Sequence, residues 1–250
     1  MRVLSGIQPT GEFHVGNYFG AMKQYVDLQD DDNEGYYFIA NYHALTTIQD
    51  ADELRRLTAD VAMNFLAFGI DPERSVLFRQ SDVPQVTELT WLLSCITPMG
   101  LLERCHAYKD KVSQGLSADH GLFAYPVLMA ADILIYDSNL VPVGQDQKQH
   151  VEVTRDLAIR FNQTFGETLV VPEPYILRNV AVVPGVDGRK MSKSYDNMIP
   201  VFATDKAIKK RVMGIVTDST PVQEPKDPDE CNVYALYKLF ATEDQAQDMA

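Results

Sequence analysis

Short apolar runs alternate with segments of helical periodicity along the first part of the chain, and this alternation limits the fold more than any other feature. Runs of strand character occupy residues 2–7, 35–40, 75–79 and 140–143. The intervening segments carry apolar residues at helical spacing, as in residues 54–66 after Asp50. This alternation predicts parallel βαβ units, and hence an α/β fold: a Rossmann-like parallel sheet with helices on both faces. Ligands of such sheets bind at the carboxyl ends of the strands.

The remaining segments set the expected domain organisation. Helical spacing is found in residues 17–28, 86–95, 101–111 and 147–165. After Pro172 the chain is loop-like, and from Thr204 it becomes helical and polar. We therefore expect a Rossmann-like catalytic domain over residues 1–200 and the start of a helical domain over residues 201–250. Because the helical pattern of residues 241–250 has no capping glycine or proline, we expect this second domain to be incomplete.

Composition argues against several classes of protein. The net charge of −13 does not fit a protein that coats nucleic acid through a strongly basic surface. The longest apolar stretch is shorter than the ~20 residues that span a bilayer. The N-terminus lacks the pattern of a signal peptide, so we expect a cytoplasmic protein. Three cysteines without a CxxC pair predict neither a disulfide framework nor structural zinc, and no metal site is expected.

Basic residues nevertheless gather at three places where a polyanion can dock. They are Arg104, Lys109 and Lys111; Arg189, Lys190 and Lys193; and Lys206, Lys209, Lys210 and Arg211.

The first motif is HVGN, residues 14–17, where a turn opens a helix. Backbone N–H groups and the helix dipole favour a phosphate at such a terminus. His14 and Asn17 can each donate a hydrogen bond to a phosphoryl oxygen. Alternatively, His14 only caps or packs the turn.

The second motif is KMSKS, residues 190–194, on a glycine-rich loop. Two lysines and two serines suit a polyphosphate, and a mobile loop can neutralise the charge that develops on departing pyrophosphate. The alternative is an exposed charged loop without a ligand.

Together the two motifs resemble those of the class I aminoacyl-tRNA synthetases. Within that class, residues 129–162 (MAADILIYDSNLVPVGQDQKQHVEVTRDLAIRFN) are similar to the tryptophanyl-tRNA synthetases, as are SGIQPTG and GNYFGA near the start. The resemblance runs through nearly all of the chain. It departs at Leu4, where the family often has an aromatic residue, and at Gln145, where a glutamate is usual.

This resemblance implies an enzyme, a tryptophan–tRNA ligase. It would convert tryptophan and ATP to tryptophanyl-adenylate and pyrophosphate, then pass tryptophan to the 3′ end of tRNA(Trp) in translation. Mg²⁺ would be bound through the ATP phosphates rather than by a protein cage. The resemblance also implies a homodimer and no membrane partner. Because family members continue for several helices, it implies that the anticodon-binding domain is incomplete here.

The resemblance assigns site residues one by one. For tryptophan, Asp132 would accept a hydrogen bond from the indole N–H. The other tryptophan residues would be His43, Tyr125, Met129, Ile133, Val141, Val143, Gln147 and Gln8. The ATP residues would be Gln8, Pro9, Thr10, Gly16, Asn17, Gly144, Gln145, Asp146, Val182, Lys190, Met191, Ser192, Lys193 and Ser194. The catalytic residues would be His14, Asn17, Lys111, Lys190 and Lys193.

Simpler readings stay open for some of these residues. Asp132 could face solvent from a helix, although its apolar neighbours favour a buried carboxylate with a partner. Tyr125, Met129 and His43 are ordinary core residues in isolation. A tyrosyl-tRNA synthetase shares the fold, and a non-catalytic tRNA-binding protein could derive from either enzyme. The intact motifs and the context VPVGQDQKQH favour the tryptophan enzyme.

Overall fold

The computed structural model describes residues 1–30, 33–105, 108–109, 113, 119–144, 147–176, 183–221 and 223–250. Its chain divides into two compact units. Unit 1 comprises Met1–Gly11 and Gln24–Leu177, and unit 2 comprises Glu12–Lys23 and Arg178–Ala250. The domain boundary expected near residue 200 stays a prediction, because these units are defined by contacts and not by function.

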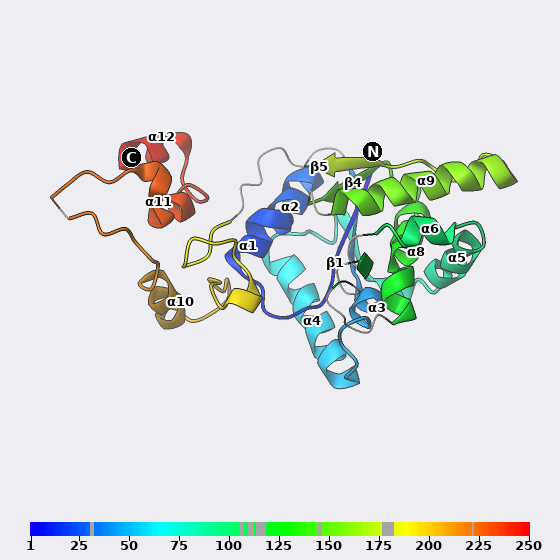
Figure 1. The fold of residues 1–250 in the computed structure, drawn as a ribbon, viewed down its shortest axis with the longest axis horizontal. Coiled ribbons are helices and arrows are strands. Elements are labelled where there is room, and N and C mark those ends of the chain that lie inside the picture. Colours follow the sequence, from blue (N-terminus) through cyan, green and yellow to red (C-terminus); the bar gives the residue numbers. More distant parts are fainter. Residues whose placement is uncertain are drawn as a thin grey trace. The chain divides into compact units, whose positions relative to one another are not determined.

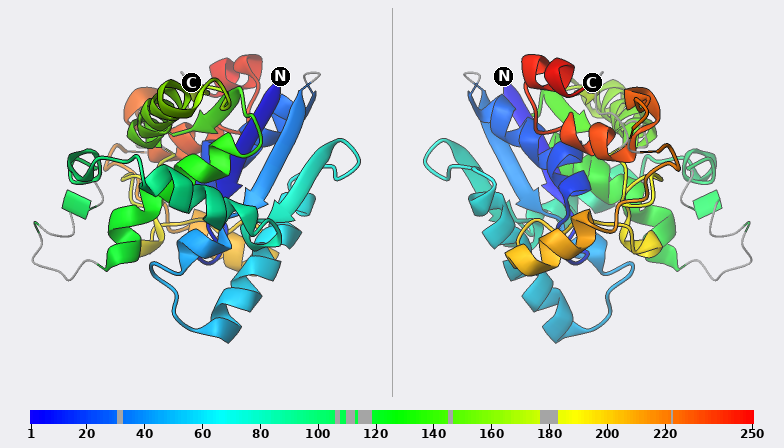
Figure 2. Two further views of the ribbon diagram at one scale, coloured as in Figure 1. Left: turned by 90° about the vertical axis from the view of Figure 1, so that its right-hand side faces the viewer. Right: turned by 90° about the vertical axis from the view of Figure 1, so that its left-hand side faces the viewer.

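Unit 1 contains a five-stranded sheet in the order β3-β2-β1-β4-β5, with every neighbouring pair parallel. The strands are β1 (Arg2–Ile7), β2 (Glu34–Ile39), β3 (Ser75–Arg79), β4 (Leu140–Val143) and β5 (Glu173–Ile176). Figure 2 shows β1, β2 and β3 side by side. The predicted parallel α/β sheet is thereby confirmed.

Two sequence expectations were wrong in detail. The segment after Pro172 was expected to be a loop, but Glu173–Ile176 forms β5. This strand pairs only with β4, and its Pro174 is tolerated because an edge strand leaves one row of N–H groups unpaired. The helix expected over residues 101–111 is broken: α6 covers only Met99–Leu102, and Glu103 to Cys105 are not helical. Much of the rest of that segment lies outside the described residues.

One face of the sheet is covered by α8 (His120–Leu134) and α9 (Lys148–Phe165). Alternate residues of a strand point to one face, so Leu4 and Phe38 lie together on it. Ile133 of α8 and Val151 of α9 pack against them. The helix α5 (Gln85–Ser94) then packs on α8, as Figure 1 shows.

The opposite face is covered by α2 (Lys23–Asp30) and α4 (Ala51–Ala67). Tyr37 of β2 points to this face and stacks on Tyr25 of α2, with ring centroids 5.2 Å apart. Tyr25 also stacks on Phe65 of α4. Asp50 caps α4 by accepting the Glu53 N–H at 2.8 Å. Helices thus cover both faces, as predicted from the sequence.

Two short elements follow strands at the carboxyl edge of the sheet. The helix α3 (Asn41–Ala44) comes directly after β2, and the 3₁₀ turn η2 (Gln80–Asp82) comes directly after β3. Because β2 and β3 are neighbours, both elements lie at the same edge of the sheet.

Unit 2 combines the start of the chain with its last part. It contains α1 (Val15–Asn17), the π-helical η1 (Tyr18–Met22), η4 (Lys193–Tyr195), α10 (Asp205–Val212), η5 (Pro228–Glu230), α11 (Asn232–Tyr237) and α12 (Glu243–Met249). Val15 packs with Val183, Met191, Ile199 and Leu236 in one core. The Val15 N–H also donates to the Ile199 carbonyl, and the Val201 N–H donates to the Phe13 carbonyl. None of the helices in the described ranges is long and apolar enough to cross a membrane.

Candidate active site

The HVGN segment of unit 2 is held in a tight turn. Asn17 Oδ1 accepts the backbone N–H of His14 at 3.0 Å, and the Val15 N–H donates to the Ile199 carbonyl at 3.0 Å. The imidazole of His14 is half-buried, and this burial lowers its pKa. At neutral pH the ring is therefore a neutral donor and acceptor and not a fixed cation.

The KMSKS loop lies against this turn within unit 2. The Gly16 N–H points at Met191 Sδ, 3.2 Å away, and Met191 is only 4% exposed. Its own N–H donates to the Val183 carbonyl at 2.8 Å. The two motifs, far apart in the sequence, therefore meet through one buried methionine, while Lys190, Lys193 and Ser194 are exposed.

Asn197, which sequence reasoning missed, organises this loop from inside. It is 1% exposed. Its Oδ1 accepts the Ser192 N–H at 2.8 Å, and its Nδ2 donates to the Lys190 carbonyl at 3.1 Å and to Asp187 Oδ1 at 2.7 Å. The backbone on both sides of Met191 is thus fixed by one side chain.

The charges of the loop are divided between internal pairs and exposed lysines. Asp187 pairs with Arg189, and Asp196 pairs with Arg211. The hydrogen bond from Asn197, followed by those from Arg189, lowers the pKa of Asp187. Among the described residues neither Lys190 nor Lys193 has a carboxylate partner. Two ammonium groups are therefore available for an anion.

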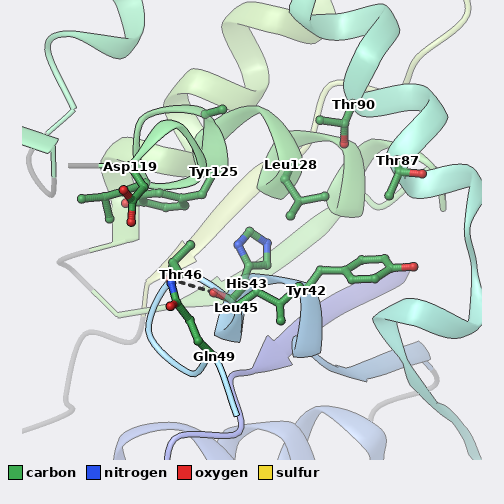
Figure 3. Close-up of a pocket in the computed structure, with 13 residues that line it drawn as sticks. Tyr42, His43, Leu45, Thr46, Gln49, Thr87, Thr90, Asp119, Tyr125 and Leu128 are labelled. Atoms are coloured by element: carbon green, nitrogen blue, oxygen red, sulfur yellow. Dashed lines mark hydrogen bonds between the residues drawn. The ribbon is translucent and has the colours of Figure 1, made fainter. Parts of the chain in front are cut away.

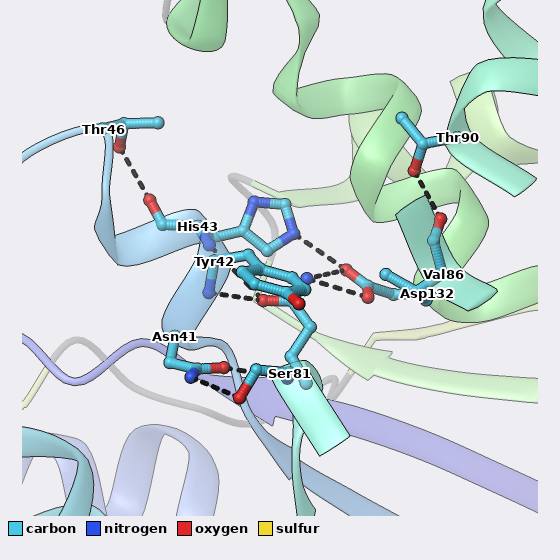
Figure 4. Close-up of polar contacts among 9 residues, drawn as sticks. Asn41, Tyr42, His43, Thr46, Ser81, Val86, Thr90 and Asp132 are labelled. Atoms are coloured by element: carbon cyan, nitrogen blue, oxygen red, sulfur yellow. Dashed lines mark hydrogen bonds and ion pairs between the residues drawn. The ribbon is translucent and has the colours of Figure 1, made fainter. Parts of the chain in front are cut away.

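In unit 1, Asp132 is a buried carboxylate with two neighbours, as Figure 4 shows for His43. It is 2% exposed, so the alternative that it faces solvent is wrong. His43 Nε2 lies 2.8 Å from Oδ2, and the amide of Gln80 donates to both oxygens at 2.9 Å. Burial raises the pKa of Asp132, and the bonds from His43 and Gln80 oppose that rise.

Gln80 is the second residue that sequence reasoning missed. It is 1% exposed and directly follows β3, at the carboxyl edge where ligands of parallel sheets bind. A polar residue at that position is the signal that could have identified it.

A cavity of about 550 Å³ has His43 of this cluster in its wall. Figure 3 shows residues that line the cavity. Its lining residues are Tyr42, His43, Leu45, Thr46, Gln49, Thr87, Thr90, Asp119, Gly121, Leu122, Ala124, Tyr125 and Leu128. Two members of the expected tryptophan set, His43 and Tyr125, line it. Asp132 is linked to the cavity through His43, whose ring lies in the wall and bonds the carboxylate.

The other expected tryptophan residues have different surroundings. Ile133 and Val141 are buried, and Met129 and Val143 are partly buried, in the core cluster around Leu4.

Tyr125 donates to or accepts from His150 Nε2 at 2.7 Å, and burial raises the pKa of Tyr125 to about 12. Tyr125 is thus a hydrogen-bonding wall residue, and its hydroxyl stays protonated at physiological pH.

The expected ATP residues of unit 1 follow two adjacent strands. Gln8, Pro9 and Thr10 come after β1, and Gly144 comes after β4. Gln147, which belongs to the expected tryptophan set, immediately precedes α9. The strand order reverses between β1 and β4, the position at which open parallel sheets bind ligands.

Four expected residues lie outside the described residues. They are Lys111, Gln145, Asp146 and Val182. Within the described ranges, no group of three or more His, Cys, Asp or Glu side chains has the arrangement of a metal site.

Comparison with known proteins gives one consistent result. The sequence model of the tRNA synthetases class I (W and Y) matches residues 1–249. The tryptophan–tRNA ligase of Rhodopirellula baltica is 60% identical over 250 residues, which are 100% of this chain and 78% of that protein. That of Fusobacterium nucleatum is 59% identical over 249 residues, 99% of this chain and 76% of that protein.

Among solved structures, the tryptophanyl-tRNA synthetase of Campylobacter jejuni, complexed with ADP and tryptophan, is similar over the whole chain. Its TM-score is 0.93 at 54% identity, and the match covers 100% of this chain and 78% of that one.

Proposed function

The chain belongs to the class I tRNA synthetases (W and Y), and from this premise we propose that it activates tryptophan and charges tRNA(Trp) with the residues described above. It is a tryptophan–tRNA ligase: tryptophan and ATP give tryptophanyl-adenylate and pyrophosphate, and the tryptophanyl group then passes to the tRNA 3′ end. The observation that carries the choice of amino acid is the buried acceptor Asp132. The carboxylate has a further lone pair that can accept the indole N–H of tryptophan.

Activation is an in-line attack of the tryptophan carboxylate on the α-phosphate of ATP. The bond to the β-phosphate breaks, and the electron pair leaves with pyrophosphate. No side-chain nucleophile takes part, so the protein contributes orientation of the reactants and neutralisation of charge.

The amino-acid end is held by the first unit. His43 and Tyr125 line the cavity, and Asp132 is fixed by hydrogen bonds before any ligand arrives. Gln8 and Gln147 supply amide groups for the carboxylate and the amino group. A carboxylate that is already fixed discriminates well, because no ordering of its side chain is needed on binding.

The phosphate groups of ATP are bound by the residues of the two motifs and by Lys111. Lys190 and Lys193 bring two positive charges to the β- and γ-phosphates, and the hydroxyls of Ser192 and Ser194 add donors. His14 and Asn17 donate to phosphoryl oxygens, and Lys111 adds a further charge. The charge on departing pyrophosphate grows in the transition state, so these cations stabilise it more than the ground state.

The loop's own residues suit ATP that carries Mg²⁺ on its phosphates. Its two carboxylates, Asp187 and Asp196, are already paired with arginines, which leaves ammonium and hydroxyl groups for the nucleotide. Mg²⁺ bound to phosphate oxygens and water shields their charge. Lys190 and Lys193 would bring positive charge to the same phosphates.

We also propose a homodimer. On α5, Trp91 is 69% exposed and Leu92 is 53% exposed, and Met99 of α6 is 63% exposed. Apolar side chains of this size are typical of protein interfaces. A cytoplasmic location also stays a prediction, and tRNA is the third substrate after tryptophan and ATP.

ATP–pyrophosphate exchange with single amino acids tests the proposed function. Exchange that depends on tryptophan is the expected result. Exchange with tyrosine but not tryptophan would assign the site to the sister enzyme. No exchange with either amino acid would favour a protein that binds tRNA without activating an amino acid.

A further inference from the structure

Gln80 connects three elements at the carboxyl edge of the sheet. It stands in η2, directly after β3, and its amide nitrogen lies 2.9 Å from both oxygens of Asp132 in α8. Its amide oxygen accepts the N–H groups of Tyr42 at 2.9 Å and His43 at 3.4 Å, at the start of α3. One buried side chain therefore bonds both α8 and α3.

The acceptor half of this amide replaces a missing helix cap. The first N–H groups of a helix have no partner within the helix. The residue at the N-cap of α3 is Ala40, which has no side-chain acceptor. Gln80 Oε1 fills this role from another element, and Asn41 and Ser81 join the two elements again through hydrogen bonds of 2.8 and 3.1 Å.

The orientation of the amide is fixed by chemistry. The backbone groups of Tyr42 and His43 can only donate, so the amide oxygen must face them. The amide NH₂ then faces Asp132. The flipped orientation would place the amide oxygen against both carboxylate oxygens and the NH₂ against two N–H donors, so all four polar contacts would be repulsive.

We propose that Gln80 is a positioning residue for amino-acid choice: its NH₂ group holds the Asp132 carboxylate in the orientation in which a further oxygen lone pair receives the indole N–H. This inference rests on the proposed function. A carboxylate accepts about four hydrogen bonds, and His43 and the shared Gln80 donor leave capacity for one more. Gln80 therefore acts through Asp132 and does not itself touch the substrate.

The protonation of Asp132 depends on this donor. Desolvation favours the neutral acid, and the donors from His43 and Gln80 oppose it. The charged and titratable groups that face Asp132 are His43 of α3 and Tyr136, which follows α8. Without the Gln80 NH₂ the carboxyl binds a proton more readily. The protonated acid carries its own O–H, which competes with the indole N–H for the same position.

Gln80→Glu is the sharpest test, because it keeps an oxygen for the α3 N–H groups and replaces the NH₂ donor. Two carboxyl groups then share one site. At lower pH the introduced carboxyl holds a proton and donates it to Asp132, whereas at pH 8 both groups are charged and repel each other. We expect kcat/KM for tryptophan to fall roughly tenfold or more at pH 8 and to recover as the pH is lowered. The preference for tryptophan over benzothienyl-alanine, which lacks the N–H, should fall at pH 8, while KM for ATP stays unchanged.

Gln29→Glu is the matched control. Gln29 is also buried, at 6% exposed, and bonds Asp71, Ser75 and Gly69 around the opposite end of β3, away from Asp132. It should lower stability without altering amino-acid preference or the pH profile. An unchanged preference and pH profile in Gln80→Glu would overturn the proposal.

If Gln80→Glu does not fold, Gln80→Met removes the donor without adding a charge. An unchanged preference in Gln80→Met would equally overturn the proposal. Failure of the proposed function is distinct, because the unmodified protein would then show no tryptophan-dependent exchange at all.

Discussion

Asn197→Ala should slow amino-acid activation by disordering the loop that carries Lys190 and Lys193. The substitution removes the bonds to the Ser192 N–H and the Lys190 carbonyl. Each neutral hydrogen bond contributes about 1 kcal/mol, so the ordered loop should lose about 2 kcal/mol. The bond to Asp187 contributes less, because that carboxylate is partly exposed and keeps its bond from Arg189. If the loop of the variant becomes ordered only in the transition state, the rate of amino-acid activation should fall roughly thirtyfold.

The assay combines urea unfolding with single-turnover formation of the adenylate at saturating tryptophan. Asn162→Ala serves as the control, because Asn162 makes three similar bonds, to Thr168 and Leu169 after α9. Both variants should unfold more easily by a similar free energy. Only Asn197→Ala should slow the chemical step. Equal rates in the two variants would refute the reasoning that Asn197 prepares the loop for catalysis.

Three further outcomes are expected. Lys193→Ala should lower the activation rate by more than it weakens tryptophan binding, and a collapse of tryptophan affinity with an intact single-turnover rate would contradict this role. Gly188→Ala should cost roughly 1–2 kcal/mol of stability in urea unfolding, because φ is +81° there and a Cβ would meet Asn232 at 2.7 Å, whereas Gly20→Ala has open space and should cost less. Burial raises the pKa of Asp132 above its ordinary 3.8, so its contribution to stability is full below that pH and is lost as the pH rises through the raised pKa. The unfolding free energy of the unmodified protein minus that of Asp132→Asn should therefore fall as the pH rises above 3.8. A difference that does not change with pH would show that the pKa of Asp132 is not raised.

The fold could be predicted where local pattern and final structure agree. The strands at residues 2–7 and 75–79 are short apolar runs, and the helix Lys148–Phe165 has strong helical periodicity. Three consecutive residues of β1 are buried, as expected of a parallel strand that is covered on both faces. β5 was missed because its four residues include a proline and alternate weakly. The prediction of one helix over residues 101–111 was wrong because apolar residues at helical spacing do not by themselves make a helix continue.

The site was predictable only in part, for a physical reason. The burial of Asp132 follows from its apolar neighbours in the sequence. Gln80 bonds Asp132 across 52 residues, and Asn197 acts on the inside of a loop. Side-chain hydrogen bonds between distant segments leave no periodic trace, so neither residue could be recognised before the fold was known. The assignment of tryptophan and ATP residues came from resemblance, and amino-acid activation by the variants tests it.

The two-part construction of unit 2 has a consequence for synthesis on the ribosome. Gly16 and Met191, which meet in the structure, are 175 residues apart. At 5–20 residues per second, translation separates their appearance by roughly 10 to 35 s. Throughout that interval Val15 has no apolar partner from residues 183–236. The nascent N-terminal segment therefore emerges first but acquires its native surroundings last, and a ribosome that stalls before residue 183 leaves it exposed to chaperones and proteases.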